Sequence, residues 1–151
     1  MSSEFLINRV EGAADLELPR YHTAGSSGLD LRANVEDVMI LKPGDFAAVP
    51  VGIRIAIPPG FEAQVRPRSG LAAKFGVTVL NTPGTVDSDY RGEIKVILIN
   101  HGKQDFEITR GMRIAQMVIM KVCMPDFCEV QELDTTQRGE GGFGHTDTTN
   151  A

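Results

Sequence analysis

The chain has 151 residues, of which 42% are hydrophobic, and a formal net charge of −5. This length fits one domain with a substantial core, and the negative charge disfavours general binding to nucleic acid or to an anionic membrane, since both require a basic surface. It does not exclude a small anionic ligand, because a few arginines can hold one. With only two cysteines, no apolar run near the ~20 residues of a membrane span and no signal-peptide pattern, we expect a cytoplasmic protein.

Short β-strands are predicted along most of the chain, because helical periodicity is nearly absent and glycine or proline recurs throughout. One short helix is expected at residues 69–74, before Gly76. The runs at 93–100 and 113–122 are apolar on both faces, which predicts strands inside a sandwich or at a subunit contact. The expected strands cover residues 5–9, 29–33, 38–41, 46–57, 61–66, 77–80, 93–100, 106–108 and 113–122.

The expected fold class is therefore all-β, as one compact barrel or sandwich of roughly ten short strands. This β domain is expected over residues 1–134. Residues 135–151 are rich in glycine, threonine and charge, and they have too little apolar surface to order themselves alone. We expect them to form a flexible C-terminal arm.

The loop at residues 81–92 is too long and too polar for a tight hairpin turn, and it contains Asp87, Asp89 and Tyr90. Its composition fits a catalytic loop, a cation site or a solvated turn. A catalytic Asp87 would be a general base, which must lie within hydrogen-bonding reach of a water aimed at an electrophile. Asp89 would point the other way on an extended strand, so we expect it to shape the turn rather than form a dyad with Asp87.

Residues 67–70 (PRSG) are a candidate phosphate site, because Arg68, the Ser69 hydroxyl and Gly70 precede the expected helix. The alternative is that Ser69 only caps that helix. Gln116 is polar in an apolar run, where a structural hydrogen bond explains it as well as a ligand does. For Asp30, which lies in a predicted strand, a cross-strand ion pair is the simpler explanation.

The arm contains a second candidate anion site, where Arg138 precedes Phe143 and glycines surround that aromatic residue. Backbone amides and Arg138 can reach an anion while Phe143 covers a ring, and the alternative is a plain disordered tail. The three histidines lack zinc-type spacing. If a cation takes part, we expect Mg²⁺ carried by a polyphosphate, since Mg²⁺ prefers oxygen ligands and keeps several waters.

Five stretches along nearly the whole chain form an ordered set: SGLDLRA at 27–33, PRSG at 67–70, NTPGTVDSDYRGE at 81–93, RIAQM at 113–117 and RGEGGFGHT at 138–146. Together they resemble the five motifs of the trimeric deoxyuridine triphosphatase (dUTPase) family. Each motif is modestly specific, but five in order are very specific. The departures are small: Ser27 stands where the family often has alanine, and residues 82–85 are a local variant that removes no expected group.

The resemblance implies a jelly-roll-like β fold and a homotrimer whose three active sites each draw on all three chains. One chain would give the phosphate-binding motifs, the second the hairpin at residues 81–90, and the third the C-terminal arm, which would close over a neighbouring subunit's site. The reaction implied is the Mg²⁺-assisted hydrolysis of dUTP to dUMP and pyrophosphate. This activity would lower dUTP and supply dUMP for thymidylate synthesis.

The resemblance also implies roles for residues of the hairpin. Asp87 would orient and deprotonate the water that attacks the α-phosphorus. Tyr90 would pack under the deoxyribose and exclude a 2′-hydroxyl, while Asn81 and nearby hairpin backbone would recognise the uracil edge. Cytosine would leave buried polar groups unpaired at about 1–3 kcal/mol each.

The remaining site residues follow from the same motifs. Asp30 would act on the Mg²⁺ shell through water, and Phe143 would stack on the uracil. The phosphates would be held by Arg68, Ser69, Gly70 and Gln116, and the γ-phosphate clamped by Arg138 and Thr146. The expected substrate-binding set also includes Gly84, Val86, Lys95 and Gly144.

Two other functions are compatible with parts of this pattern. A dCTP deaminase shares the fold and a related nucleotide site, but Asp87, Tyr90 and the arm fit hydrolysis better than deamination. Release of ammonia or of pyrophosphate separates the two. A non-catalytic protein that uses nucleotide-controlled ordering of the arm as a switch is the second alternative, against which an intact Asp87 argues.

Overall fold

The structure is a computed structural model that describes residues 4–142. These residues form eleven strands and one short helix, so the expected all-β class is confirmed. In chain order the elements are β1 (Leu6–Arg9), β2 (Leu29–Arg32), β3 (Met39–Leu41), β4 (Phe46–Pro50), β5 (Ile53–Ala56), β6 (Phe61–Arg66), α1 (Ser69–Phe75), β7 (Val77–Val79), β8 (Gly84–Val86), β9 (Lys95–Asn100), β10 (Phe106–Ile108) and β11 (Arg113–Lys121).

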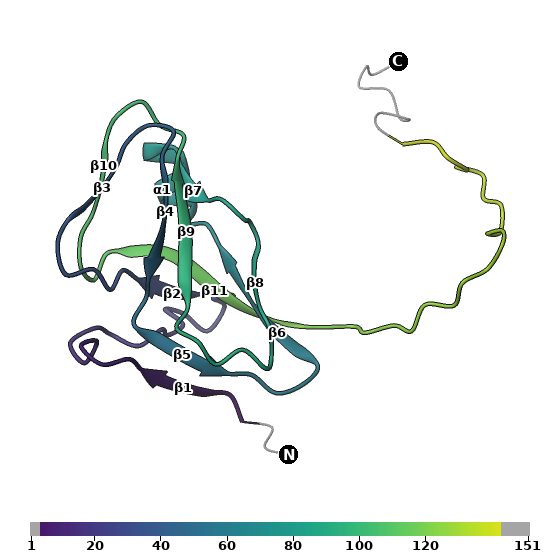
Figure 1. Ribbon diagram of the computed structural model, residues 1–151, viewed down its shortest axis with the longest axis horizontal. Helices are drawn as coiled ribbons and strands as arrows, with labels where there is room; N and C mark the ends of the chain where they lie inside the picture. The colour runs from purple at the N-terminus through teal and green to yellow at the C-terminus, as the bar shows by residue number, and fades with distance from the viewer. Residues whose placement is uncertain (1–3, 143–151) are drawn as a thin grey trace.

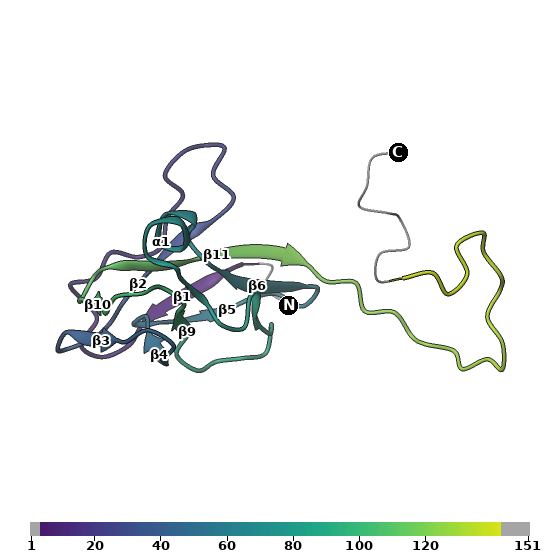
Figure 2. The ribbon, with the colours of Figure 1, turned by 90° about the horizontal axis from the view of Figure 1, so that it is seen from above.

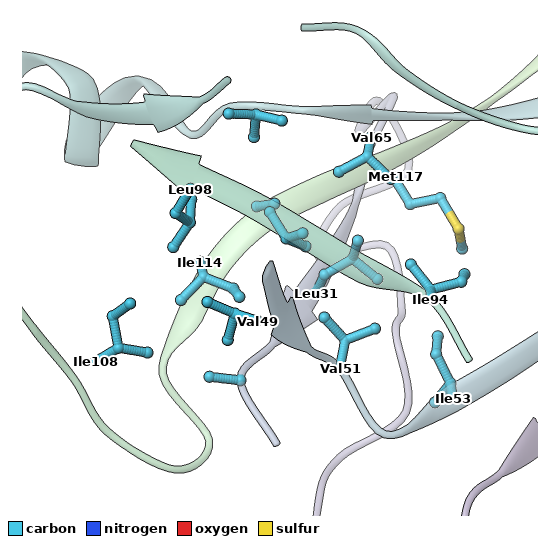
Figure 3. Close-up of a cluster of buried hydrophobic side chains, with 14 of the residues drawn as sticks. Leu31, Val49, Val51, Ile53, Val65, Ile94, Leu98, Ile108, Ile114 and Met117 are labelled. Atoms are coloured by element: carbon cyan, nitrogen blue, oxygen red, sulfur yellow. The ribbon is translucent and has the colours of Figure 1, made fainter. Parts of the chain in front are cut away.

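Four small antiparallel sheets enclose one hydrophobic core (Figures 1 and 3). The largest has the order β2-β11-β6-β8, and a three-stranded sheet has the order β4-β9-β7. The two strands predicted to be apolar on both faces, β9 and β11, each lie between two partners. Their alternate side chains reach the core formed by Leu31, Val49, Leu98, Ile108, Ile114 and their neighbours.

The long alternating run at residues 46–57 is two strands rather than one. Its apolar face is buried as expected, from Val49 to Ile57. The chain leaves the β4–β9 pair and joins β1 through β5, and the change of sheet occurs at Gly52, which has a φ of 73°. A Cβ atom at Gly52 would lie 2.8 Å from the Ala13 side chain. A side chain is therefore excluded there by both backbone conformation and space.

The helix α1 is one residue longer than predicted, and it ends at Gly76, whose φ of 68° is left-handed. Arg68 occupies the N-cap position, and no side chain makes a capping hydrogen bond. The interpretation of Ser69 as a helix cap is therefore wrong. In the described part of the chain, no helix is long and apolar enough to cross a membrane.

After β11 the chain leaves the body of the molecule and extends away from it (Figures 1 and 2). The segment from residue 122 to 134 carries exposed apolar side chains, including Met124 (83%), Phe127 (95%) and Leu133 (84%). These side chains have no surface of their own chain to pack on. The division between a β domain and an arm at residue 134 stays a prediction, because a neighbouring copy would decide where packing ends.

Asn100 is fully buried at the end of β9 and connects three parts of the fold. Its amide nitrogen donates to the main-chain oxygens of Leu41 and Gln104, both at 2.8 Å. Its amide oxygen accepts from the Gly102 N–H at 2.8 Å. The side chain thus links β3, the end of β9 and the loop after it through three main-chain groups.

Replacing Asn100 by alanine would leave these three main-chain groups without their partner. We expect the free energy of unfolding to fall by about 2–4 kcal/mol, measured by urea denaturation at fixed protein concentration. Gln104→Ala is the matched control, because it keeps the carbonyl that accepts the bond, and its stability should not change. An Asn100→Ala variant as stable as wild type would contradict this role.

Candidate active site

The middle of the largest sheet aligns residues from three strands. Gln116 of β11 lies opposite Asp30 of β2 on one side and opposite Arg66 of β6 on the other. Its amide nitrogen donates to the Pro67 oxygen at 3.0 Å. A Cβ atom at Gly28 would lie 2.3 Å from the Gln116 side-chain oxygen, so only glycine leaves room for this amide.

Asp30 connects the cationic side chains around this row. Its Oδ1 lies 3.1 Å from Arg68 Nε, and its Oδ2 lies 3.2 Å from Arg113 Nη1. His22 Nε2 lies 2.9 Å from the same Oδ2. The simple expectation of an ion pair for Asp30 is thus met, but with more than one partner.

The ionised form of Asp30 is favoured despite its position. Partial burial acts to raise the pKa of this carboxyl. The hydrogen bond from His22 and the charges and hydrogen bonds of Arg68 and Arg113 outweigh the burial, and they hold the pKa below its ordinary value. At neutral pH the carboxylate therefore remains an acceptor for these cations.

A cavity of about 330 Å³ lies over this cluster. It combines two arginines, three serines and one glutamine around one carboxylate, a donor set that suits a polyanion. Five predicted residues, Asp30, Arg68, Ser69, Gly70 and Gln116, are brought together here. The remaining lining residues are His22, Ser26, Ser27, Gly28 and Arg113.

Sequence reasoning missed two of the charged or titratable groups in this cavity. Arg113 opens the RIAQM motif, and its position before Gln116 on a strand was a usable signal. His22 lies in a loop with no pattern of its own, and only the folded chain brings it to Asp30.

The loop at residues 81–92 contains a strand that the sequence analysis did not predict. The three residues of β8 pair with β6, with Val86 opposite Ala63 and Gly84 opposite Val65. Asp87 follows directly. This strand is short and begins with glycine, so its own sequence gives little β signal, and the pairing with β6 determines it.

The hairpin forms a second cavity of about 300 Å³. The predicted residues Val86, Asp87, Tyr90 and Lys95 line it, whereas Asn81, Gly84 and Asp89 do not. Asn81 lies beside Gly84, where a Cβ atom would come within 3.3 Å of its amide nitrogen.

The two acids of the hairpin occupy different positions. The Tyr90 N–H donates to the main-chain oxygen of Asp87 at 3.2 Å, so residues 87–90 form a turn and not an extended strand. Asp87 is exposed and faces the cavity, and no described residue donates a hydrogen bond to its carboxylate. Asp89 is exposed outside the lining. We expected Asp89 to point away from Asp87 because side chains alternate along a strand. That reason is wrong, since the two residues lie in a turn.

Tyr90 is fixed by its neighbours in the turn. Its hydroxyl donates to the main-chain oxygen of Glu93 at 3.0 Å. A Cβ atom at Gly92 would lie 2.2 Å from that hydroxyl oxygen, so the ring packs in space that only glycine provides. The side-chain carboxylate of Glu93 accepts a hydrogen bond from the Gly52 N–H at 3.0 Å, which attaches the hairpin to the junction of β4 and β5.

Asp87 and the cationic cavity lie at opposite ends of β6. The register of β8 on β6 continues to Asp87 opposite Glu62, whereas Arg68 follows the other end of β6. At about 3.3 Å per residue, the six steps from Glu62 to Arg68 correspond to about 20 Å. The cavities have no lining residue in common, and Figure 1 shows β8 running away from α1. One chain does not bring Asp87 to the cationic cavity.

The arm residues of the predicted site are distant from both cavities or outside the described residues. Arg138 lines neither cavity, and its Nε donates to the Gly141 main-chain oxygen at 2.7 Å. Phe143, Gly144 and Thr146 lie outside the described residues, so their predicted roles are not tested here.

The donor set does not form a protein cage for a metal ion. Within residues 4–142, no group of three histidine, cysteine or acidic side chains is close enough to hold one. Asp30 is the only carboxylate of the cationic cavity, and its oxygens already face His22, Arg68 and Arg113. The residues fit a cation that arrives bound to phosphate oxygens, as Mg²⁺ does.

Comparisons with known proteins agree with the sequence motifs. The dUTPase family model matches residues 14–147. A deoxyuridine 5′-triphosphate nucleotidohydrolase from Thermoanaerobacter sp. is 56% identical over 146 residues, which cover 97% of this chain and 99% of that relative. The one from Neorickettsia sennetsu is 63% identical over 134 residues, covering 89% and 90%.

Solved structures show the same fold at much lower identity. The dUTPase of Staphylococcus bacteriophage 80alpha with dUPNHPP has a TM-score of 0.83 at 20% identity, covering 96% of this chain and 99% of that one. A variant dUTPase from phage phi11 of S. aureus, which coordinates a structural Mg(II) ion, has a TM-score of 0.75 at 17% identity, covering 87% and 99%. With this jelly-roll-like β fold and these sequence matches, the chain belongs to the dUTPase family.

Proposed function

We propose that this dUTP diphosphatase works at sites shared between copies of the chain, with the triphosphate held on one copy and the water activated on another. The reaction, the hydrolysis of dUTP to dUMP and pyrophosphate, is assigned from the membership of the dUTPase family. The observation that supports the shared site is the strand register, which puts Asp87 level with the start of β6 while Arg68 follows its end, a separation of about 20 Å at the usual rise per residue. The triphosphate chain is too short to connect them.

The cationic cavity is proposed as the phosphate-binding half of the site. Arg68 and Gln116 supply charged and neutral donors, and the Ser69 hydroxyl is not used in capping α1. Gly70 keeps the backbone accessible, since a Cβ atom there would meet nothing within 4 Å. Fixed donors of this kind stabilise charge as it moves onto the leaving pyrophosphate, without reorganisation during the reaction.

The hairpin of a neighbouring copy is proposed as the nucleoside-binding half. Asp87 takes a proton from the attacking water, and its exposed carboxylate is free to accept one. Tyr90 packs under the deoxyribose and excludes a 2′-hydroxyl. Asn81 and the backbone around Gly84 and Val86 recognise the uracil edge. Lys95, on the wall of the same cavity, adds positive charge near the substrate.

Mg²⁺ is proposed to enter with the triphosphate. Bound there, it neutralises phosphate charge and holds the chain of phosphates in one geometry. Asp30 lines the phosphate cavity, and its carboxylate would accept hydrogen bonds from water in the shell of such an ion. The arginine contacts of Asp30 support this outer role over direct ligation.

The arm over residues 135–151 is proposed to complete the site of a neighbouring copy. Arg138 and Thr146 clamp the γ-phosphate, Phe143 stacks on the uracil, and Gly144 allows the backbone to follow the ligand. The extended path of the chain after β11 supports this reach (Figure 2).

The assembly proposed is a homotrimer in the cytoplasm. Exposed apolar side chains at Met124, Phe127 and Leu133 support association, because they require an apolar surface that the single chain does not supply. The trimer gives each site one phosphate cavity, one hairpin and one arm.

The substrate is tested by pyrophosphate release from dUTP, UTP, dCTP and dTTP in the presence of Mg²⁺. We expect strong preference for dUTP, because Tyr90 rejects the ribose and the hairpin rejects cytosine and the thymine methyl group. Ammonia release from dCTP would contradict the proposal and favour deamination. Equal rates with UTP would remove the role given to Tyr90.

Asp87→Asn should keep dUTP binding and lose most of the turnover, on the order of a hundredfold or more, because the amide cannot accept the proton of the water. The binding is measured by calorimetry and the turnover by pyrophosphate release. Asp89→Asn is the matched control in the same turn and should stay near wild type. If Asp87→Asn turns over dUTP at the wild-type rate, Asp87 is not the base.

A further inference from the structure

We propose that His22 is a positioning residue of the phosphate cavity, which fixes the Asp30 carboxylate so that Asp30 holds Arg68 and Arg113 in place. The inference rests on the proposed phosphate-binding role of this cavity. It assigns the cavity a residue that none of the five motifs contains.

The direction of the hydrogen bond between His22 and Asp30 follows from the chemistry of the two groups. The His22 Nε2 atom lies 2.9 Å from Asp30 Oδ2. An ionised carboxylate can only accept, so Nε2 carries the proton and donates it. The Asp30 side chain is 15% exposed and the His22 side chain 42% exposed, so the acceptor is more shielded than the donor.

The hydrogen bond from His22 also fixes the orientation of the Asp30 carboxylate. Asp30 Oδ2 faces both His22 and Arg113, while Oδ1 faces Arg68 Nε at 3.1 Å. A carboxylate without the histidine can rotate about its terminal bond, because that torsion is broad. With Oδ2 held by two donors, Oδ1 stays directed at Arg68.

The contacts of Arg68 within the protein decide which of its hydrogen-bond donors is left for a ligand. Its Nε is used by Asp30, and its Nη1 donates to the Arg113 oxygen at 3.1 Å. Among the described residues, Nη2 has no partner, although Arg68 lines the cavity. The guanidinium group is therefore anchored on two sides and presents its remaining donor to a bound anion. Its planar shape makes this orientation specific.

His22 also attaches the rim of the cavity to the sheet. It precedes a turn in which the Thr23 N–H donates to Ser26 Oγ at 3.0 Å, and the Ser26 N–H donates to the Thr23 oxygen at 3.1 Å. Ser26 and the two residues after it line the cavity. The bond from His22 to Asp30 is a direct side-chain link between this turn and β2.

His22→Ala should raise the KM for dUTP about three- to tenfold, because a partly exposed hydrogen bond to a charged group is lost. The kcat should change less than about twofold, since Asp87 and the hairpin are untouched. His22→Gln should recover most of the loss, because its amide N–H can replace Nε2–H. His101→Ala, which removes an exposed histidine from a different cavity, is the control and should match wild type.

Binding separates this role from a general structural one and from a role in the Mg²⁺ shell. A non-hydrolysable imido analogue of dUTP should bind His22→Ala more weakly both with Mg²⁺ and with EDTA, while dUMP affinity stays unchanged. If the wild-type protein hydrolyses dUTP and His22→Ala has the same KM and the same analogue affinity, the role of His22 is refuted while the proposed function stands. A loss seen only with Mg²⁺, an equal loss for dUMP or no recovery with glutamine would also overturn that role. A wild-type protein inactive on dUTP would instead refute the proposed function.

Discussion

The register of β11 between β2 and β6 is the constraint on which the phosphate cavity depends. It places Asp30, Gln116 and Arg66 in one row, and the chain passes directly from that row to Arg68. Main-chain hydrogen bonds set this row, so the donors are in place before any ligand binds. A slip of one residue would turn Gln116 to the other face and remove its bond to Pro67. Preorganised donors of this kind are the main resource of an enzyme that transfers a phosphoryl group without a covalent nucleophile.

The same sheet is the reason why we propose that one chain is not sufficient. Pairing of β8 with β6 fixes Asp87 at the end of the sheet opposite the cavity, and Glu93 and Tyr90 hold the hairpin there. Moving Asp87 to the phosphates of its own chain would break these contacts. The association of copies that we propose would bring the two halves together without any change of fold. The apolar side chains of the segment after β11 give that association a driving force.

Much of this arrangement could be predicted from the sequence, and the failures have physical causes. Alternation located the core face of residues 46–57, and the turn chemistry located most strand ends, because burial and backbone conformation are local properties. The change of sheet at Gly52 depends on contact with Ala13, and β8 depends on its partner β6. The contact of His22 with Asp30 is equally a product of the fold. The motifs supplied the candidate residues of the site, but only the register showed which of them one chain can bring together.

The central claim is that Asp87 and the phosphate cavity of one chain serve different sites. It is tested most directly by mixing two variants that are inactive alone, Asp87→Asn and Arg68→Ala, and refolding them together in equal amounts. If each site combines a cavity from one copy with a hairpin from another, random assembly restores about a quarter of the wild-type activity. If both halves come from the same chain, every site keeps one defect, and the mixture stays as inactive as its components. That result would contradict the account.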